Sequence, residues 1–353
     1  MKAPFFTTLI DTYNYGHFVE EAVSSVLAQD FPAEEREILV VDDGSTDETP
    51  ERLRKFRDAI RYLRKPNGGQ ASAFNFGFEH ASGEVITLLD ADDVWLPGKL
   101  GRLFEAFDRN PYVGMVYHRA WNWNSANEIS EDRVFAAVSG RVPENRSTLL
   151  QYAMVGTSCL AFRRSVLREL LPIPEVLRSQ ADAYLTALVI FLAPVLAVPE
   201  YLGKYRLHGT NLFQTDVQRT SPSQIEHRMA MREALLSAIQ NWLLQHGQIL
   251  DSSDIRAYLM QWTKAQEQDS FLLGAPGRLE YFRHLIEYPR IYREIMTPRH
   301  RTYSYLRAFG ALFLGYHHLH LLDELQRKRK RWFSFSKDKN VRDRSEKALA
   351  AKG

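Results

Sequence analysis

The first half of the chain alternates short apolar runs with segments of helical periodicity, and this alternation limits the available folds more than any other feature. Runs with strand character span Phe5–Asp11, Glu37–Asp42, Ile60–Arg64, Val85–Leu89, Val113–His118 and Ser158–Phe162. Between them, Phe18, Ala22 and Val26 fall on one helical stripe. Strands that alternate with helices are typical of α/β domains. We therefore predict an α/β fold with a central, mostly parallel sheet.

The second half of the chain lacks this alternation. Long segments of helical character follow residue 220, at Ser223–His246, Ser252–Leu273, Arg278–Ile286 and Thr302–Gln326. The last residues are strongly basic and lack an apolar pattern. We predict three parts: an α/β domain at 1–220, a helical region at 221–326 and a flexible basic tail at 327–353.

Composition narrows the function classes. The formal net charge of +2 gives no overall field that would favour a nucleic acid partner. Cys159 is the single cysteine, so no intrachain disulfide can form and a reducing compartment is expected. The N-terminal sequence lacks a secretory signal, and Pro194 interrupts the longest apolar run, Tyr184–Val198. These features predict a cytoplasmic protein.

Acidic and small polar residues gather where three predicted strands end. The first strand ends in "DTYN", the second in "VDDGSTD" and the fourth in "DADD". Ligands of α/β sheets bind outside the carboxyl ends of the strands, so we expect these residues to share one site.

The crowding of Asp90, Asp92 and Asp93 raises the question of what balances their charge. Carboxylates so close together repel each other unless a cation or a hydrogen-bond donor intervenes. Mg²⁺ and Mn²⁺ prefer oxygen ligands, often one or two carboxylates together with substrate phosphates. Both groups of acids also have a structural alternative. Asp90, Asp92 and Asp93 could form a turn of solvated acids, and the acids after the second strand could only cap the following helix.

Three motifs in order carry a resemblance to a known family. "TYNYGHFVEEAVSSVLAQDFP", "EILVVDDGSTDET" and "NGGQASAFNFGFEHASGEVITLLDADDVWLPGKL" resemble those of the family 2 glycosyltransferases. The resemblance covers about Phe5 to Asn211 and implies a GT-A nucleotide-sugar-binding domain. It also implies an inverting, metal-dependent enzyme that transfers a sugar from a nucleotide diphosphate sugar to a hydroxyl of a glycan or lipid-linked acceptor. Cell-surface polysaccharide synthesis is the expected role.

The resemblance assigns the acids at the strand ends to different roles. It makes Asp90 and Asp92 the DXD motif and His208 a third ligand of Mn²⁺ or Mg²⁺, with Asp93 structural. Asp43 corresponds to the residue that binds the nucleotide base, and Asp42 to one that holds its loop. The full nucleotide-sugar-binding set that we predict is Thr12, Tyr13, Asn14, Asp43, Gly69, Gln70, Asn75, Asp90, Gly156, Thr157 and Arg206.

Two roles are consistent with the position of Asp11 in the sequence. A carboxylate at this position could contact the nucleotide base, or it could pair with Arg64 or Lys65.

The segment "VLRSQADAYLTAL" resembles the one that carries the catalytic base, which points to Asp182. A carboxylate there would take the proton of the attacking hydroxyl. The structural alternative is an aspartate in the first turn of a helix. Relatives often have an acid where Ala181 stands, and this difference leaves a second hypothesis: a non-catalytic nucleotide-sugar-binding subunit of a polysaccharide assembly complex. The absence of GxGxxG after the first strand argues against a dehydrogenase.

The C-terminal helix and basic tail also have two interpretations. Leu306, Phe309, Phe313 and Tyr316 fall at helical spacing, and the basic run Arg327–Arg331 follows. Such a helix could lie on the anionic inner face of a membrane, as a peripheral contact. It could equally be an ordinary packing helix followed by a solvated tail.

Overall fold

The computed structural model describes residues 3–124, 126–131, 137–144, 149, 152, 155–208, 211, 221–274, 276–291, 293, 296–316 and 318–319. The chain divides into two compact units, residues 1–269 and 270–353. The first unit therefore contains the predicted 1–220 domain together with part of the predicted helical region. The predicted tail at 327–353 lies outside the described residues.

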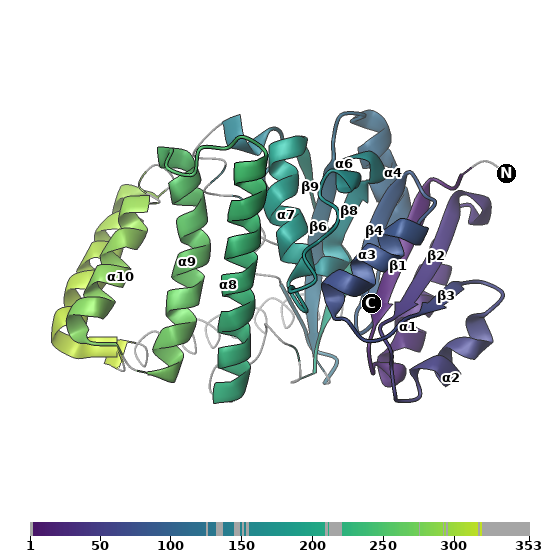
Figure 1. Cartoon of the computed structure of the whole chain (residues 1–353), viewed down its shortest axis with the longest axis horizontal. Helices are drawn as coiled ribbons and strands as arrows, with labels where there is room; N and C mark the ends of the chain where they lie inside the picture. The colour runs from purple at the N-terminus through teal and green to yellow at the C-terminus, as the bar shows by residue number, and fades with distance from the viewer. Residues whose placement is uncertain are drawn as a thin grey trace, which may run out of the picture. The chain divides into compact units, whose positions relative to one another are not determined.

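Four parallel strands form the first part of the sheet, in the order β3-β2-β1-β4 (Figure 1). Their bounds are β1 Phe6–Thr12, β2 Arg36–Asp42, β3 Arg61–Arg64 and β4 Val85–Asp90. The cores of β2 and β4 are nearly continuous apolar runs, and β1 buries Thr7 and Thr8 together with its apolar residues, as expected of strands that are covered on both faces. The predicted α/β fold is confirmed, and each of these four strands was predicted within one or two residues.

The rest of the sheet is mixed. Its strands are β5 Val94–Trp95, β6 Met115–Asn124, β7 Ile129–Glu131, β8 Leu160–Arg163 and β9 Val195–Leu207. β8 is antiparallel to both β4 and β6, whereas β9 runs parallel to β6. β9 was not predicted. It begins directly after Pro194, the residue that interrupts the apolar run in the sequence.

Helices cover both faces of the sheet. Their bounds are α1 Gly16–Leu27, α2 Thr49–Leu53, α3 Gln70–His80, α4 Lys99–Arg109, α6 Arg164–Arg168 and α7 Ala181–Leu192, with 3-10 turns at η1 Ala33–Glu35, η2 Arg54–Phe56, η3 Val142–Glu144 and η4 Thr157–Cys159. Successive strand residues point to opposite faces. Accordingly, Leu9 joins the core on the α3 and α7 side, while Ile10 joins the core on the α1 and α4 side.

The helical region consists of α8 Pro222–Gln245, α9 Ser253–Leu273, α10 Arg278–Ile291 and a further helix at 298–316. Ser221 begins α8 with a capping box that includes Gln224. α8 packs on α7 and extends the core on that side of the sheet through Leu235 and Ile239 (Figure 1). Among the described helices, none combines the length and apolarity that crossing a membrane requires.

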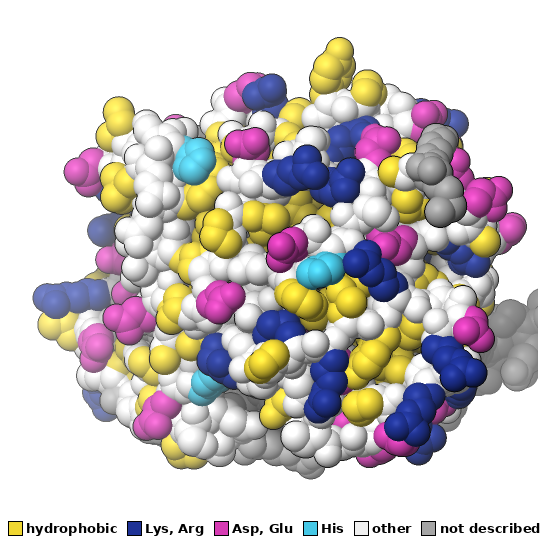
Figure 2. All heavy atoms as spheres, turned by 45° about the vertical axis from the view of Figure 1, so that its right-hand side comes forward, with side chains coloured by type: hydrophobic (Ala, Val, Ile, Leu, Met, Phe, Trp, Pro, Cys, Tyr) yellow, Lys and Arg dark blue, Asp and Glu magenta, His cyan; other side chains and the backbone are white. Residues whose placement is uncertain are grey.

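The surface of the molecule mixes charges of both signs. On the face shown in Figure 2, acidic and basic side chains are interspersed among hydrophobic ones. This distribution fits the small net charge of +2.

Two helical glycines provide a matched test of how tightly helices pack on the sheet. A Cβ atom on Gly77 of α3 would lie 2.5 Å from Leu9 Cδ1 in the core, whereas a Cβ on Gly101 of α4 would meet nothing within 4 Å. We expect Gly77→Ala to lower the free energy of unfolding by about 1–3 kcal/mol through overpacking. We expect Gly101→Ala to raise it by about 0.5–1 kcal/mol through helix propensity. Chemical denaturation measures both, and equal effects would contradict the packing described for α3.

Candidate active site

Three carboxylates lie together at the end of β4. Asp90, Asp92 and Asp93 each offer a ligand atom, and these atoms lie within 4.8 Å of one another. The backbone N–H of Asp93 donates to the Asp90 carbonyl at 3.1 Å, which makes the tight turn that brings the side chains together. Burial, and then the charges of neighbouring acids, raise the pKa of Asp90 and Asp93 well above the usual range. The predicted crowding of like charges is therefore present in the structure.

Asp11 adds a fourth carboxylate beside this cluster. It lies directly across from Asp90 in the register of β1 and β4. Its Oδ1 is buried with no hydrogen-bond partner among the described residues. Burial raises the pKa of Asp11 to about 7, and the charges of Asp92, Asp182 and Asp43 also act to raise it.

The structure does not pair Asp11 with Arg64 or Lys65, the alternative predicted from the sequence. Arg64 lies 3.7 Å from Asp42, and Lys65 lies 2.8 Å from Asp43. Asp11 therefore faces the site with an unsatisfied oxygen, and it belongs to the candidate site residues.

His208 lies close to the acidic cluster. Its Nε2 is 2.9 Å from Asp92 Oδ2, and the side chain of Asn211 accepts a hydrogen bond from its backbone N–H. The rings of Tyr15 and Phe18 lie at 5.9 Å and 5.1 Å from the imidazole ring. The structure thus brings together the three residues predicted to bind a metal, Asp90, Asp92 and His208.

The donor set at this position fits a divalent cation. It combines several carboxylates and one imidazole, the ligand types that Mn²⁺ and Mg²⁺ sites use. An oxygen of Asp11 has no partner among the described residues, and the pKa values of Asp90 and Asp93 stay raised although the charge of Arg206 acts to lower that of Asp93. Within the described part of the chain, the negative charge of the cluster is therefore not fully balanced.

The side chain of Arg206 holds the backbone of the acidic cluster. Its Nε donates to the Asp92 carbonyl at 2.7 Å, and its guanidinium bonds Glu21 of α1 at 2.6 Å. The same guanidinium lies over the rings of Phe18 and Trp123 at 4.7 Å and 4.1 Å. Arg206 is therefore adjacent to the cluster, and its predicted contact with the diphosphate stays a prediction.

The carboxylate of Asp43 organises the glycine-containing loop before α3. It accepts hydrogen bonds from Lys65 Nζ and Asn67 Nδ2 and from the backbone N–H groups of Gly68 and Gly69, at 2.7–3.1 Å. Asp42 in turn accepts from Ser45 N–H at 2.7 Å and so holds the β2–α2 turn. Both carboxylate oxygens of Asp43 therefore bind this loop. The predicted bond from Asp43 to a nucleotide base stays a prediction.

The residues that follow β1 have separate roles. Asn14, which has a φ of 57°, accepts hydrogen bonds from the backbone N–H groups of Thr46 and Asp47 and so joins the loops after β1 and β2. Thr12 is buried, and its hydroxyl has no partner within the described part of the chain. Tyr13 is 46% exposed. Of these three predicted nucleotide contacts, Thr12 and Tyr13 have side chains with capacity for a ligand.

Gly69 and Gln70 join the start of α3 to the segment that precedes Asp182. A Cβ on Gly69, which has a φ of +86°, would lie 2.6 Å from Arg178 Cα, so only glycine allows this approach. Gln70 Oε1 accepts from the N–H of Ala181 at 3.0 Å. Gln70 therefore fixes the residue that precedes the predicted catalytic base.

Asn75, also predicted to bind the nucleotide sugar, has a packing role in this structure. Its amide nitrogen donates to the Ile173 carbonyl and its amide oxygen accepts from the Ile173 N–H, both at 2.8 Å. Both ends of the side chain are used in this way, so nothing in the geometry directs Asn75 to a ligand.

Asp182 lies in the first turn of α7, and Thr157 contacts it. The Thr157 hydroxyl donates to Asp182 Oδ2 at 3.1 Å, and the N–H of Ala183 donates to Oδ1 at 2.8 Å. Gly156 begins the 3-10 turn that carries Thr157. Burial raises the pKa of Asp182, and the charge of Asp182 acts in turn to raise the pKa of Asp90 and Asp11. Asp182 is thus electrostatically coupled to the cluster at the strand ends.

Lys99 and Ser158 form a junction beneath the site that sequence reasoning missed. Lys99 is fully buried at the start of α4, and its Nζ donates to the Ser158 carbonyl at 2.7 Å and lies 3.9 Å from the centre of the Trp95 ring. The Ser158 hydroxyl accepts from the backbone N–H of Asp90 at 3.0 Å. The turn that contains Ser158 therefore contacts the acidic cluster through Asp90 and the predicted base through Thr157. The local sequence "WLPGK" does not indicate that Lys99 is buried.

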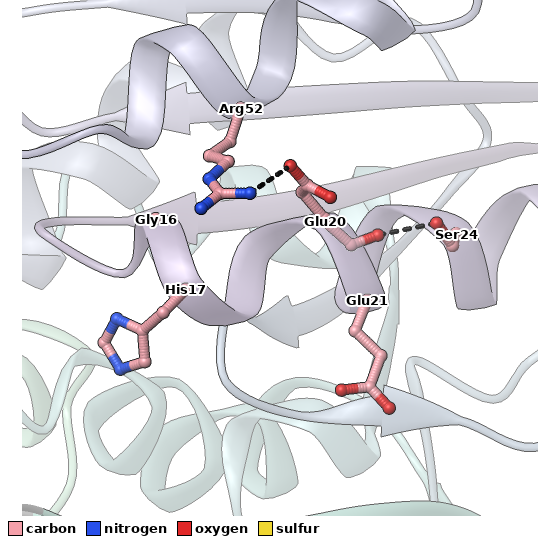
Figure 3. A pocket seen from close by; sticks show the side chains of 6 residues that line it. All are labelled: Gly16, His17, Glu20, Glu21, Ser24 and Arg52. Atoms are coloured by element: carbon pink, nitrogen blue, oxygen red, sulfur yellow. Dashed lines mark hydrogen bonds and ion pairs between the residues drawn. The ribbon is translucent and has the colours of Figure 1, made fainter.

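A surface pocket of about 410 Å³ lies on the outer side of α1 (Figure 3). Gly16, His17, Glu20, Glu21, Ser24 and Arg52 line it. Arg52 pairs with Glu20 at 3.4 Å, while Glu21 pairs with Arg206. The pocket thus touches the site through one ion pair and contains no residue predicted from the sequence.

The buried amine of Lys99 predicts a specific pH dependence. Burial lowers the pKa of Lys99 from 10.5 to about 7. Between these values the unfolded chain binds more protons than the folded one, so this group makes the protein more stable as pH rises. We expect the unfolding free energy of the parent, relative to Lys99→Met, to increase by up to about 1.4 kcal/mol per pH unit from pH 7.5 to 9. Denaturant titrations at several pH values measure it.

Lys55→Met is the matched control, because the Lys55 side chain is 56% exposed. The difference in unfolding free energy between the parent and Lys55→Met is the reference for the pH slope of Lys99→Met. Equal pH slopes of the two differences would contradict the lowered pKa of Lys99.

Comparisons with known proteins agree with this fold. A sequence model described as Glycosyl transferase family 2 matches residues 7–171. An uncharacterized glycosyltransferase of Nostoc sp. is 33% identical over 250 residues, which cover 68% of this chain and 76% of that protein. An uncharacterized glycosyltransferase of Mycoplasma pneumoniae is 34% identical over 123 residues, or 33% of this chain and 41% of its own length.

Solved structures share the fold over most of the chain. S. aureus TarS 1–349 in complex with UDP has a TM-score of 0.59 at 18% identity and covers 87% of both chains. The same protein with UDP-GlcNAc has a TM-score of 0.58 at 17% identity and covers 87% of this chain and 88% of that one. The predicted GT-A fold with a helical C-terminal region is therefore confirmed. On the family match and the Nostoc relative, the chain belongs to glycosyl transferase family 2 and is a glycosyltransferase.

Proposed function

We propose that this glycosyltransferase moves one sugar from a nucleotide diphosphate sugar to a hydroxyl of a glycan or lipid-linked acceptor, with inversion at the sugar carbon and a requirement for Mn²⁺ or Mg²⁺. The observation that carries the proposal is the convergence of Asp11, Asp90, Asp92 and Asp182 at the carboxyl end of the sheet, with an oxygen of Asp11 unpartnered. Such a group of acids suits a ligand that brings a cation and a diphosphate together.

In this proposal Asp90, Asp92 and His208 hold the metal, which when bound would stabilise the negative charge that develops on the leaving diphosphate. Arg206 keeps the Asp92 backbone in place through its bond to the carbonyl. Ser158 does the same for Asp90 by accepting its N–H. The positions of the metal-binding groups therefore depend on residues of β9 and of the turn before β8.

Asp182 is the proposed general base. The acceptor hydroxyl gives its proton to the Asp182 carboxylate while its oxygen forms a bond to the sugar carbon and the bond from that carbon to the phosphate oxygen breaks. The nucleoside diphosphate leaves with the bonding electrons. Burial raises the pKa of Asp182, which makes its carboxylate a stronger base. Direct displacement with one base inverts the configuration of the sugar carbon.

The hydrogen bonds to Asp182 direct its free lone pairs. Thr157 donates to Oδ2 and the N–H of Ala183 donates to Oδ1, so both oxygens have fixed positions. Gln70 fixes the preceding residue by accepting the N–H of Ala181. Ala181 itself is fully buried in the core on the α7 side of the sheet.

The donor site belongs to the same proposal. We propose that the predicted nucleotide-sugar-binding residues other than Asn75, whose amide bonds Ile173, surround the nucleotide sugar. These are Thr12, Tyr13, Asn14, Asp43, Gly69, Gln70, Asp90, Gly156, Thr157 and Arg206. TarS, which shares the fold, has been solved with UDP and with UDP-GlcNAc, and this supports a nucleotide-sugar donor here.

A role in cell-surface polysaccharide synthesis and a cytoplasmic location, with contact to the inner face of a membrane, complete the proposal. The single cysteine supports a reducing compartment, and the basic run Arg327–Arg331 supports an anionic surface as a partner.

Substitution of Asp182 tests the catalytic assignment. We expect Asp182→Asn to lower kcat for nucleoside diphosphate release from a panel of activated sugars by about 10²–10⁴-fold, since the amide cannot accept the proton. Binding of the nucleoside diphosphate should stay within about threefold, because Asp182 serves the acceptor side.

Asp58→Asn is the control, since that side chain is 98% exposed. If Asp182→Asn and Asp58→Asn both keep the parental kcat, Asp182 has no part in the mechanism. Loss of nucleotide binding in Asp182→Asn would mean that the substitution disrupts the site as a whole.

A further inference from the structure

The 298–316 helix of the second unit buries its small side chains. Ala308 and Ala311 are fully buried in a cluster with Phe271, Tyr281, Leu285 and Leu319. These two alanines lie three positions apart, on one side of the helix.

Five large apolar side chains of the same helix point away from that cluster, whereas Tyr316 packs against it. Leu306 is 66% exposed and Phe313 is 77% exposed, while Tyr303, Phe309 and Leu314 are 42–51% exposed. At 100° per residue these five side chains form one stripe opposite the two alanines. We call them the apolar stripe. Phe309 also packs partly on Phe282 of α10, with ring centres 5.4 Å apart.

This arrangement is the reverse of what an ordinary packing helix does. Burial of a Leu or Phe side chain contributes far more apolar area than burial of Ala, so a helix that only packs would turn its large residues inward. Contiguous exposed apolar side chains mark an interaction surface. The structure therefore favours the surface interpretation of this helix over the packing one.

The charges around the apolar stripe identify the partner. The sequence from 295 to 322 contains Arg299, Arg301 and Arg307 and no Asp or Glu, with Glu294 just before this segment and Asp323 and Glu324 just after it. The basic run Arg327–Arg331 follows shortly after. A second copy of the chain would bring these cations against each other, whereas an anionic lipid surface offers both an apolar interior and negative head groups.

We propose that the apolar stripe is a membrane-binding surface that inserts into the interface of an anionic lipid bilayer, with Arg299 and Arg307 on the head groups. Helices of this kind lie in the plane of the interface, and their binding depends on both buried apolar area and anionic lipid. This inference rests on the membrane contact of the proposed function and names the surface that makes it. Its test is separate from that of the transferase reaction, because neither donor nor metal takes part in vesicle binding.

Vesicle sedimentation tests the surface with the full chain. We expect the protein to sediment with vesicles of phosphatidylcholine and phosphatidylglycerol, and at least tenfold less with phosphatidylcholine alone. The double variant Leu306→Ser, Phe313→Ser should lose at least tenfold in affinity for the anionic vesicles. High salt should weaken the binding of the parent, because part of it is electrostatic.

The matched control is Tyr112→Ser, Ile249→Ser, which removes two equally exposed apolar side chains, at 86% and 72%, from the first unit. It should bind vesicles like the parent, and thermal unfolding should show both double variants folded. Failure of the parent to sediment with anionic vesicles, or equal binding by the two variants, would overturn the proposal. A second result would also overturn it: light scattering shows a dimer that Leu306→Ser, Phe313→Ser dissociates, and the parent does not bind vesicles. A second copy of the chain would then be the partner.

Discussion

Repulsion among buried carboxylates is the constraint around which this structure is arranged. The parallel register of β1 and β4 sets Asp11 beside Asp90, and the turn after β4 adds Asp92 and Asp93. Burial and these mutual charges raise the pKa of Asp11 to about 7 and that of Asp90 well above its usual range. A fold that served stability alone would separate such groups, and the proposed divalent cation would supply the positive charge that balances them.

The surrounding residues hold this unfavourable cluster in place by bonding its backbone. Arg206 binds the Asp92 carbonyl, Ser158 binds the Asp90 N–H, and Lys99 holds Ser158 from below. The same turn carries Thr157, which contacts Asp182. The donor side and the acceptor side of the proposed reaction are thus connected through two adjacent residues of one short turn, Thr157 and Ser158. Small displacements of this turn would move both groups together.

Local pattern predicted the framework of the site, and long-range contacts determined the rest. The apolar runs that end in acids located β1, β2 and β4 and, through them, the cluster around Asp90. The burial of Lys99 and the partners of Asn75 depend on segments about 60 and 98 residues away, which no local pattern encodes. β9 was missed because its run continues that of α7 across Pro194. Asp11 stayed ambiguous because its neighbours Asp90 and Asp182 come from elsewhere in the chain.

Calorimetric titration with a nucleoside diphosphate, in the presence and absence of Mn²⁺, tests the central claim most directly. If a cation and a diphosphate together balance the carboxylates, the nucleotide will bind at least tenfold more tightly with Mn²⁺ than in a chelator, and Asp92→Asn will abolish that difference while leaving the protein folded. Equal nucleotide affinity with and without the metal, in a parent protein that transfers sugar under both conditions, would contradict the account.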